Sequence, residues 1–77
     1  MFSYMLNIEY DVPTFLDALE KLDKIPNIQK LERLDDVDGG VYQTYTLNGK
    51  PIVLKLSVSD NSVHVEADID IGKFIKN

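Results

Sequence analysis

The fold is decided by residues 41–71, which read VYQTYTLNGKPIVLKLSVSDNSVHVEADIDI. Asn48-Gly49 is a strong signal for a two-residue hairpin turn, and Asp60-Asn61 is a weaker one. Around these pairs, apolar and polar residues alternate with the period of a half-buried strand. The stretch therefore predicts an antiparallel meander of three strands.

The registers of the two predicted hairpins support each other. A turn centred on Asn48-Gly49 places Tyr45 opposite Ile52, and a turn centred on Asp60-Asn61 places Ile52 opposite Ile69. Both turns gather apolar side chains on one face, and a slip of one residue in either hairpin would scatter them. The opposite face then carries one row made of Tyr42, Lys55 and Glu66.

A further strand and a helix are predicted before the meander. Residues 2–10 alternate, with one face formed by Phe2, Tyr4, Leu6, Ile8 and Tyr10. Residues 13–25 have helical apolar spacing at Phe15, Ala18, Leu19, Leu22 and Ile25. Asp11 precedes this helix as a cap or first-turn charge, and Pro26 either ends or kinks it. Its exposed face carries the i,i+4 pairs Asp17–Lys21 and Glu20–Lys24.

Residues 28–34, IQKLERL, allow two interpretations. Ile28, Leu31 and Leu34 have the spacing of a short second helix. A strand would instead place Gln29, Leu31 and Arg33 on one face, which is a poor face to bury. We therefore expect a short helix here, followed by a loop over residues 35–40.

These elements predict an α+β fold with two layers, in which one amphipathic helix packs on a mainly antiparallel sheet. The expected order is β-α-(short helix)-β-β-β, in one small domain over residues 1–77. A chain of this size buries only about 60% of its unfolded surface, and no cysteine is available for a disulfide. We therefore expect a homodimer, formed either edge to edge through a strand or through the terminal residues. Phe74 and Ile75 are expected either to pack back on the core or to supply that contact.

The charge excludes some classes of function. The chain has 13 acidic and 8 basic residues, a net charge of −5, and a single arginine, Arg33. Direct binding of nucleic acid or an anionic membrane requires clustered Lys and Arg, so neither is expected. The sequence has no apolar segment near the roughly 20 residues of a membrane span, and no basic leader precedes an apolar run. We expect a cytoplasmic protein.

The last predicted strand suggests a surface for a basic partner. Its outward residues include Glu66, Asp68 and Asp70. Side chains on one face of a strand repeat every ~6.7 Å, about twice the ~3.4 Å rise per phosphate of one DNA strand. A straight row of three carboxylates would therefore imitate DNA phosphates. The alternative is a solvated face that protects an edge strand, and the pairing of Lys55 with Glu66 favours that alternative.

Other residues are candidates for the same partner-binding surface. The loop acids Asp35, Asp36 and Asp38 would extend it if they lie on the same side, and Tyr42 would be an outward-facing anchor. Asp36-Val37-Asp38-Gly39-Gly40 looks like the start of a calcium loop, but its twelfth position is Leu47 and not the required Glu. No metal site or cofactor is expected.

Catalytic residues are not expected either. The only histidine, His64, is predicted to face outward opposite Ser57, on an open sheet face without a pocket. Nucleophilic catalysis requires a nucleophile, a base and an orienting group held together. The chain is thus expected not to be an enzyme.

Two hypotheses for function follow from these patterns. In the first, the chain is an acidic DNA mimic that inhibits or regulates a basic DNA-binding protein, such as a nucleoid-associated protein, a repressor or a nuclease. In the second, it is a generic protein-interaction subunit or adaptor that uses an apolar flank or an open strand edge.

Overall fold

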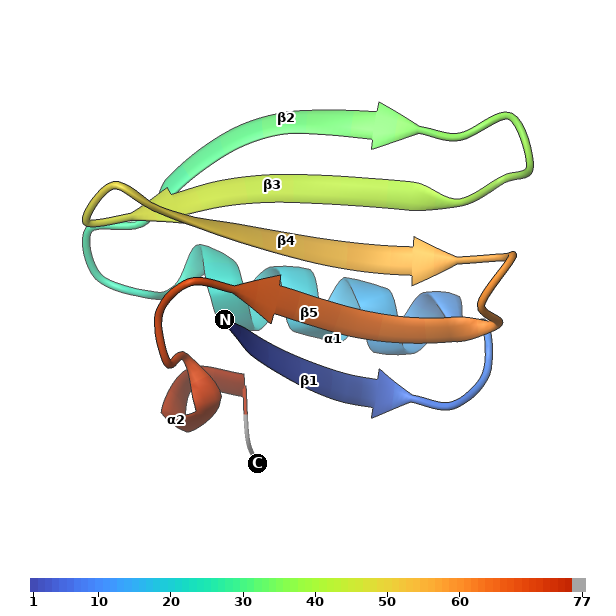
Figure 1. Cartoon of the computed structure of the whole chain (residues 1–77), viewed down its shortest axis with the longest axis horizontal. Helices are drawn as coiled ribbons and strands as arrows, with labels where there is room; N and C mark the ends of the chain where they lie inside the picture. Colours follow the sequence, from blue (N-terminus) through green and yellow to red (C-terminus); the bar gives the residue numbers. More distant parts are fainter. Residues whose placement is uncertain (76–77) are drawn as a thin grey trace.

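The computed structural model describes residues 1–75 and contains a five-stranded antiparallel sheet with one helix packed on one face (Figure 1). The predicted α+β class is confirmed. The elements in chain order are β1 (Phe2–Asn7), α1 (Val12–Asp23), β2 (Gln29–Asp35), β3 (Val41–Leu47), β4 (Lys50–Ser57), β5 (Ser62–Ala67) and α2 (Gly72–Ile75).

The two strands that flank α1 lie at opposite edges of the sheet. The strand order is β1-β5-β4-β3-β2, and every neighbouring pair is antiparallel. The chain therefore passes from one edge to the other through α1 (Figure 1). The sequence alone did not predict which strand pairs with the first one. In the structure β1 pairs with β5, with Tyr4 opposite Val65.

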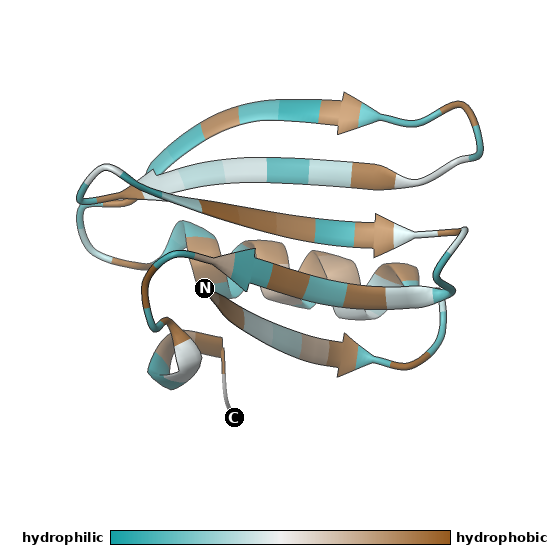
Figure 2. Ribbon diagram, viewed as in Figure 1, coloured by the Kyte–Doolittle hydropathy of each residue, from teal (hydrophilic) through white to brown (hydrophobic). Residues whose placement is uncertain are grey.

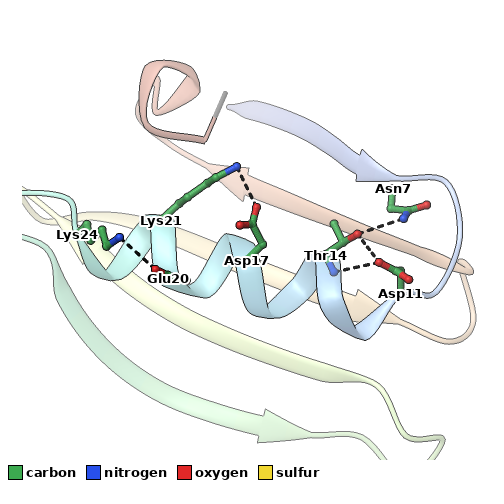
Figure 3. Close-up of polar contacts among 7 residues, drawn as sticks. All are labelled: Asn7, Asp11, Thr14, Asp17, Glu20, Lys21 and Lys24. Carbon is green, nitrogen blue, oxygen red and sulfur yellow. Dashed lines mark hydrogen bonds and ion pairs between the residues drawn. The ribbon is translucent and has the colours of Figure 1, made fainter. Parts of the chain in front are cut away.

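The helix forms where the sequence predicts it, but it begins one residue earlier and ends two residues earlier, at Asp23. The Asp11 carboxylate accepts a hydrogen bond of 3.0 Å from the Thr14 backbone N–H and so caps α1 (Figure 3). Ion pairs join Lys21 to Asp17 at 2.9 Å and Lys24 to Glu20 at 3.1 Å. The buried face of α1 contributes to the core Phe15, Ala18 and Leu22.

The first hairpin has the predicted register, with Tyr45 opposite Ile52 and Leu47 opposite Lys50. Asn48 and Gly49 both have positive φ, 54° and 76°. That backbone suits a two-residue turn, because its twist matches the twist of the strands.

The second hairpin differs from the prediction by two residues. Ser57 lies opposite Ser62, so the loop has four residues and Ile52 faces Ala67 instead of Ile69. The wider turn is stabilised by the Ser57 hydroxyl, which accepts a hydrogen bond of 3.1 Å from the Asp60 N–H. Because a shift of two residues keeps every side chain on its face, the predicted apolar face is still correct.

Residues 28–34 are not a short helix; the prediction is wrong, and the segment forms the edge strand β2. A β-bulge lies between Lys30, which faces Tyr45, and Arg33, which faces Gln43. One extra residue turns the two-residue alternation into a spacing of three, and that spacing resembles a helix in the sequence.

The buried Gln43 side chain holds this bulge. Its amide donates to the backbone carbonyls of Leu31 and Glu32 at 3.2 and 3.3 Å. The Thr44 hydroxyl donates to the same Glu32 carbonyl at 2.8 Å. These side chains thus replace the regular ladder where β2 and β3 lose their register.

The first and the last of the predicted strands are both shorter than expected. β1 ends at Asn7, and Ile8 and Tyr10 are exposed instead of lying on the apolar face. β5 ends at Ala67, after which the chain turns into α2. Ile75 is buried against the core, and Phe74 packs beside it. None of the described helices is long and apolar enough to cross a membrane.

We expect Gln43→Leu to loosen β2 selectively, because it removes the donor to two carbonyls of the bulge. The free energy of unfolding should fall by about 1–3 kcal/mol. Amide hydrogen exchange should accelerate at least tenfold in β2 and remain slow in β4 and β5. Thr46→Val is the matched control, since the Thr46 hydroxyl meets only the Gln29 side chain. Unchanged protection of β2 in the Gln43 variant would contradict this role.

Candidate protein-interaction surface

The edge formed by β2 is the most exposed part of the sheet. All seven residues of β2 are exposed, whereas β3, β4 and β5 each bury alternate side chains. Leu31 and Leu34 are 50% and 52% exposed. Figure 1 shows why: α1 lies behind the middle of the sheet, at the level of β4 and β5, and β2 lies beyond it.

The side chains of β2 combine apolar and charged groups in a short repeat. Figure 2 shows hydrophobic segments alternating with hydrophilic ones along this strand. Lys30 forms an ion pair with Asp23 of α1 at 3.2 Å, and Arg33 forms one with Asp35 at 3.1 Å. With Glu32 included, the strand carries two positive and two negative charges and is electrically neutral.

The predicted straight row of carboxylates does not form. Only Glu66 belongs to β5, because the strand ends at Ala67. Asp70 accepts hydrogen bonds from the Tyr4 hydroxyl at 2.6 Å and from the Gly72 N–H at 2.9 Å, so it is held at the start of α2. Asp68 is exposed, and its backbone N–H donates to Pro51. The DNA-like spacing is therefore absent.

Glu66 is also largely neutralised by its neighbours. Its Oε1 atom lies 2.7 Å from Lys55 Nζ and 3.3 Å from His64 Nε2. The hydrogen bond from Lys55 is the main cause that holds the pKa of Glu66 below its usual range. A carboxylate paired in this way is a poor substitute for a phosphate.

His64 lies opposite Lys55 and not opposite Ser57, because of the shifted register. Its Nδ1 atom is 3.2 Å from the Ser62 hydroxyl, so Ser62, His64 and Glu66 form a chain of polar contacts. Ser62 is buried, whereas a nucleophile must reach its substrate. Among residues 1–75, no group of three or more His, Asp or Glu side chains is placed to hold a metal ion.

Acidic residues from three loops gather at one end of the sheet. The Tyr10 N–H donates to the Asn61 side chain at 2.9 Å, and the Tyr10 hydroxyl contacts the Gly39 carbonyl at 3.4 Å. These contacts join the loops before α1, after β2 and after β4. We call this region the acidic end; it consists of Glu9, Asp36, Asp38 and Asp60.

Tyr42 belongs to the acidic end as well. Its hydroxyl donates to Asp36 at 3.3 Å, and partial burial together with the Asp36 carboxylate raises the pKa of Tyr42. Between the two loop acids, Val37 is completely exposed. Asp36 and Tyr42 are thus brought together at the acidic end, whereas Asp35 pairs with Arg33.

The two predicted acidic groups do not share a surface. Asp35 lies opposite Val41, where β3 begins, whereas Asp68 lies beside Pro51, where β4 begins. These points are at opposite ends of the β3–β4 hairpin. The surface formed by β2 was not predicted from the sequence, although a strand was one of the two interpretations of this segment. Its only signal was the pair of leucines beside opposite charges.

We expect Glu66→Gln to lower the free energy of unfolding by about 0.2–1 kcal/mol at neutral pH, as is typical of a cross-strand ion pair. The folded pKa is lowered, so the stabilisation is present above the ordinary carboxyl value of 4.5 and is lost as the pH falls through the folded value. Denaturant unfolding at pH 7 and pH 3 should show the difference shrinking. In a Lys55→Met background the substitution should have little effect at either pH; an equal effect in both backgrounds would contradict the pairing.

Comparisons with known proteins supply no relative: no protein-family model matches the chain, and neither the curated proteins nor the solved structures contain a match. Function must be inferred from the two surfaces themselves, the edge of β2 and the acidic end.

Proposed function

We propose that this chain is a non-enzymatic protein-interaction module that binds a strand of its partner along the edge of β2. The observation that carries the proposal is the exposure of all seven β2 residues at the end of the strand order. An edge strand offers unpaired backbone donors and acceptors, and an added strand gains affinity from those hydrogen bonds.

The side chains of β2 support binding and not only protection of an edge. Lys30, Arg33 and the bulge are typical devices against uncontrolled pairing. Leu31 and Leu34, however, each leave about half of their surface in water. Covering them would add apolar burial to the backbone pairing, at ~25 cal/mol per Å².

A second candidate function is supported by the acidic end. Four carboxylates from three loops gather there, in a chain whose net charge is −5. Such a surface attracts basic proteins and accelerates their association. The chain therefore remains a candidate regulator of a basic, DNA-binding protein. The surface that binds this partner would be the acidic end and not the carboxylates of β5.

Site-specific photo-cross-linking in cells of the source organism distinguishes the two candidates. A benzophenone amino acid is placed at Leu34, at Val37 or at Met5, which are exposed on β2, at the acidic end and on β1 respectively. We expect a discrete protein adduct from Leu34 and none from Met5. An adduct from Val37 alone would support the acidic end instead, and equal labelling from all three positions would contradict both.

A further inference from the structure

We propose that the strand added to β2 is the β2 strand of a second copy of this chain, paired antiparallel about a two-fold axis. This inference rests on the proposed interaction role of β2 and names its partner. The two sheets would join into one continuous sheet, with α1 of each copy outside the new contact.

The charge pattern of β2 is complementary to itself. Residues 30–35 read KLERLD, so a positive charge begins the segment and a negative charge ends it, with a leucine inside each. An antiparallel second copy places Lys30 opposite Asp35 of that copy and Leu31 opposite its Leu34. Both pairs occur twice by symmetry, and opposite-charge or apolar pairs directly across a sheet are stabilising.

The bulge makes this register geometrically possible. In a regular strand, residues five apart point to opposite faces, so Lys30 and Asp35 could not meet. Here Lys30 faces Tyr45 and Asp35 faces Val41, which are four residues apart on β3 and lie on the same face. The extra residue thus returns both charges to one face.

The leucines share the other face with Glu32. Leu34 lies opposite Tyr42, and the bulge leaves Leu31 and Glu32 together opposite Thr44, two residues further along β3. An antiparallel copy brings Leu31 and Leu34 of the two chains together on that face. Their half-exposed surfaces would be buried against each other.

Arg33 lies on the proposed two-fold axis, where it would face Arg33 of the second copy. This like-charge contact is compensated, because each guanidinium is already held by Asp35 at 3.1 Å. The copy's Asp35 then lies diagonally across the strand pair, within reach of a long side chain. The cluster as a whole is neutral.

The overall charge also favours this surface over the others. Two chains of −5 repel each other, but β2 itself is neutral. The acidic end follows directly after β2, at Asp36. Antiparallel pairing therefore separates the two acidic ends and places each beside the start of the other copy's β2.

Charge reversal with rescue tests the register directly. Wild type, Lys30→Glu, Asp35→Lys and an equimolar mixture of the two variants are compared by sedimentation equilibrium from micromolar to millimolar concentration. Wild type should show a mass between 8.8 kDa and twice that value, rising with concentration. Each variant alone sets like charges at both symmetric positions, and its dimer dissociation constant should rise about tenfold.

In the mixture, opposite charges meet again at both positions, so dimerisation should return to near the wild-type affinity. Lys50→Glu makes the same charge change at the β3–β4 turn and should leave dimerisation unchanged. Circular dichroism and thermal melting at low concentration check that each variant is folded, since Lys30 and Asp35 also have partners within the chain.

Two results would overturn the inference: wild type that stays monomeric at millimolar concentration, or a mixture that associates no better than its components. Failure of the dimer is distinguishable from failure of the interaction role. If wild type is monomeric but the Leu34 cross-linker captures a different protein, β2 is a binding edge and its partner is not a second copy. If Leu34 captures nothing, both proposals are wrong.

Discussion

One helix of twelve residues must cover a sheet of five strands, and the exposed surfaces of this protein follow from that constraint. Such a helix is about 18 Å long and about 10 Å wide, whereas the outer strands of a five-stranded sheet lie about 19 Å apart. The apolar face of α1 therefore covers the middle of the sheet, where Leu22, Ile52 and Val65 are completely buried. No helix remains for β2, so its exposure is a consequence of the architecture.

How far the sequence predicts the fold depends on the kind of signal that each element carries. The first hairpin was predictable to the residue, because Asn48-Gly49 requires positive φ at both positions and so fixes the register. The second hairpin was predictable only in its faces. Ser57 stabilises a wider turn by accepting a hydrogen bond from the Asp60 N–H, which the Asp60-Asn61 pair alone does not reveal. A shift of two residues leaves the apolar face of the strands unchanged, and that is why Val63, Val65 and Ala67 are buried as predicted.

The candidate surface was less predictable than the fold. Two predictions about it, the short helix and the row of carboxylates, were wrong because of contacts between residues distant in the sequence. β2 resembled a helix because its bulge depends on Gln43, more than ten residues away, whose amide satisfies two carbonyls. The row of carboxylates failed because Asp70 binds Tyr4, from the other end of the chain. In both cases a polar residue, Gln43 or Asp70, forms hydrogen bonds within the fold that the sequence pattern does not predict. The contact between Tyr42 and Asp36, by contrast, joins residues that are close in the sequence.

The bulge connects the fold to the proposed function. Without it, β2 would alternate regularly, and Leu31 and Leu34, which are three residues apart, would point to opposite faces. The extra residue instead sorts Lys30, Arg33 and Asp35 to the face that carries α1, and leaves the leucines beside Tyr42 and Thr44. A strand sorted in this way presents a charged row on one face, and on the other face a row that holds both leucines and Glu32. The buried Gln43 side chain donates hydrogen bonds to the backbone of the bulge. The sheet thus stabilises β2 in the conformation to which a second strand would bind.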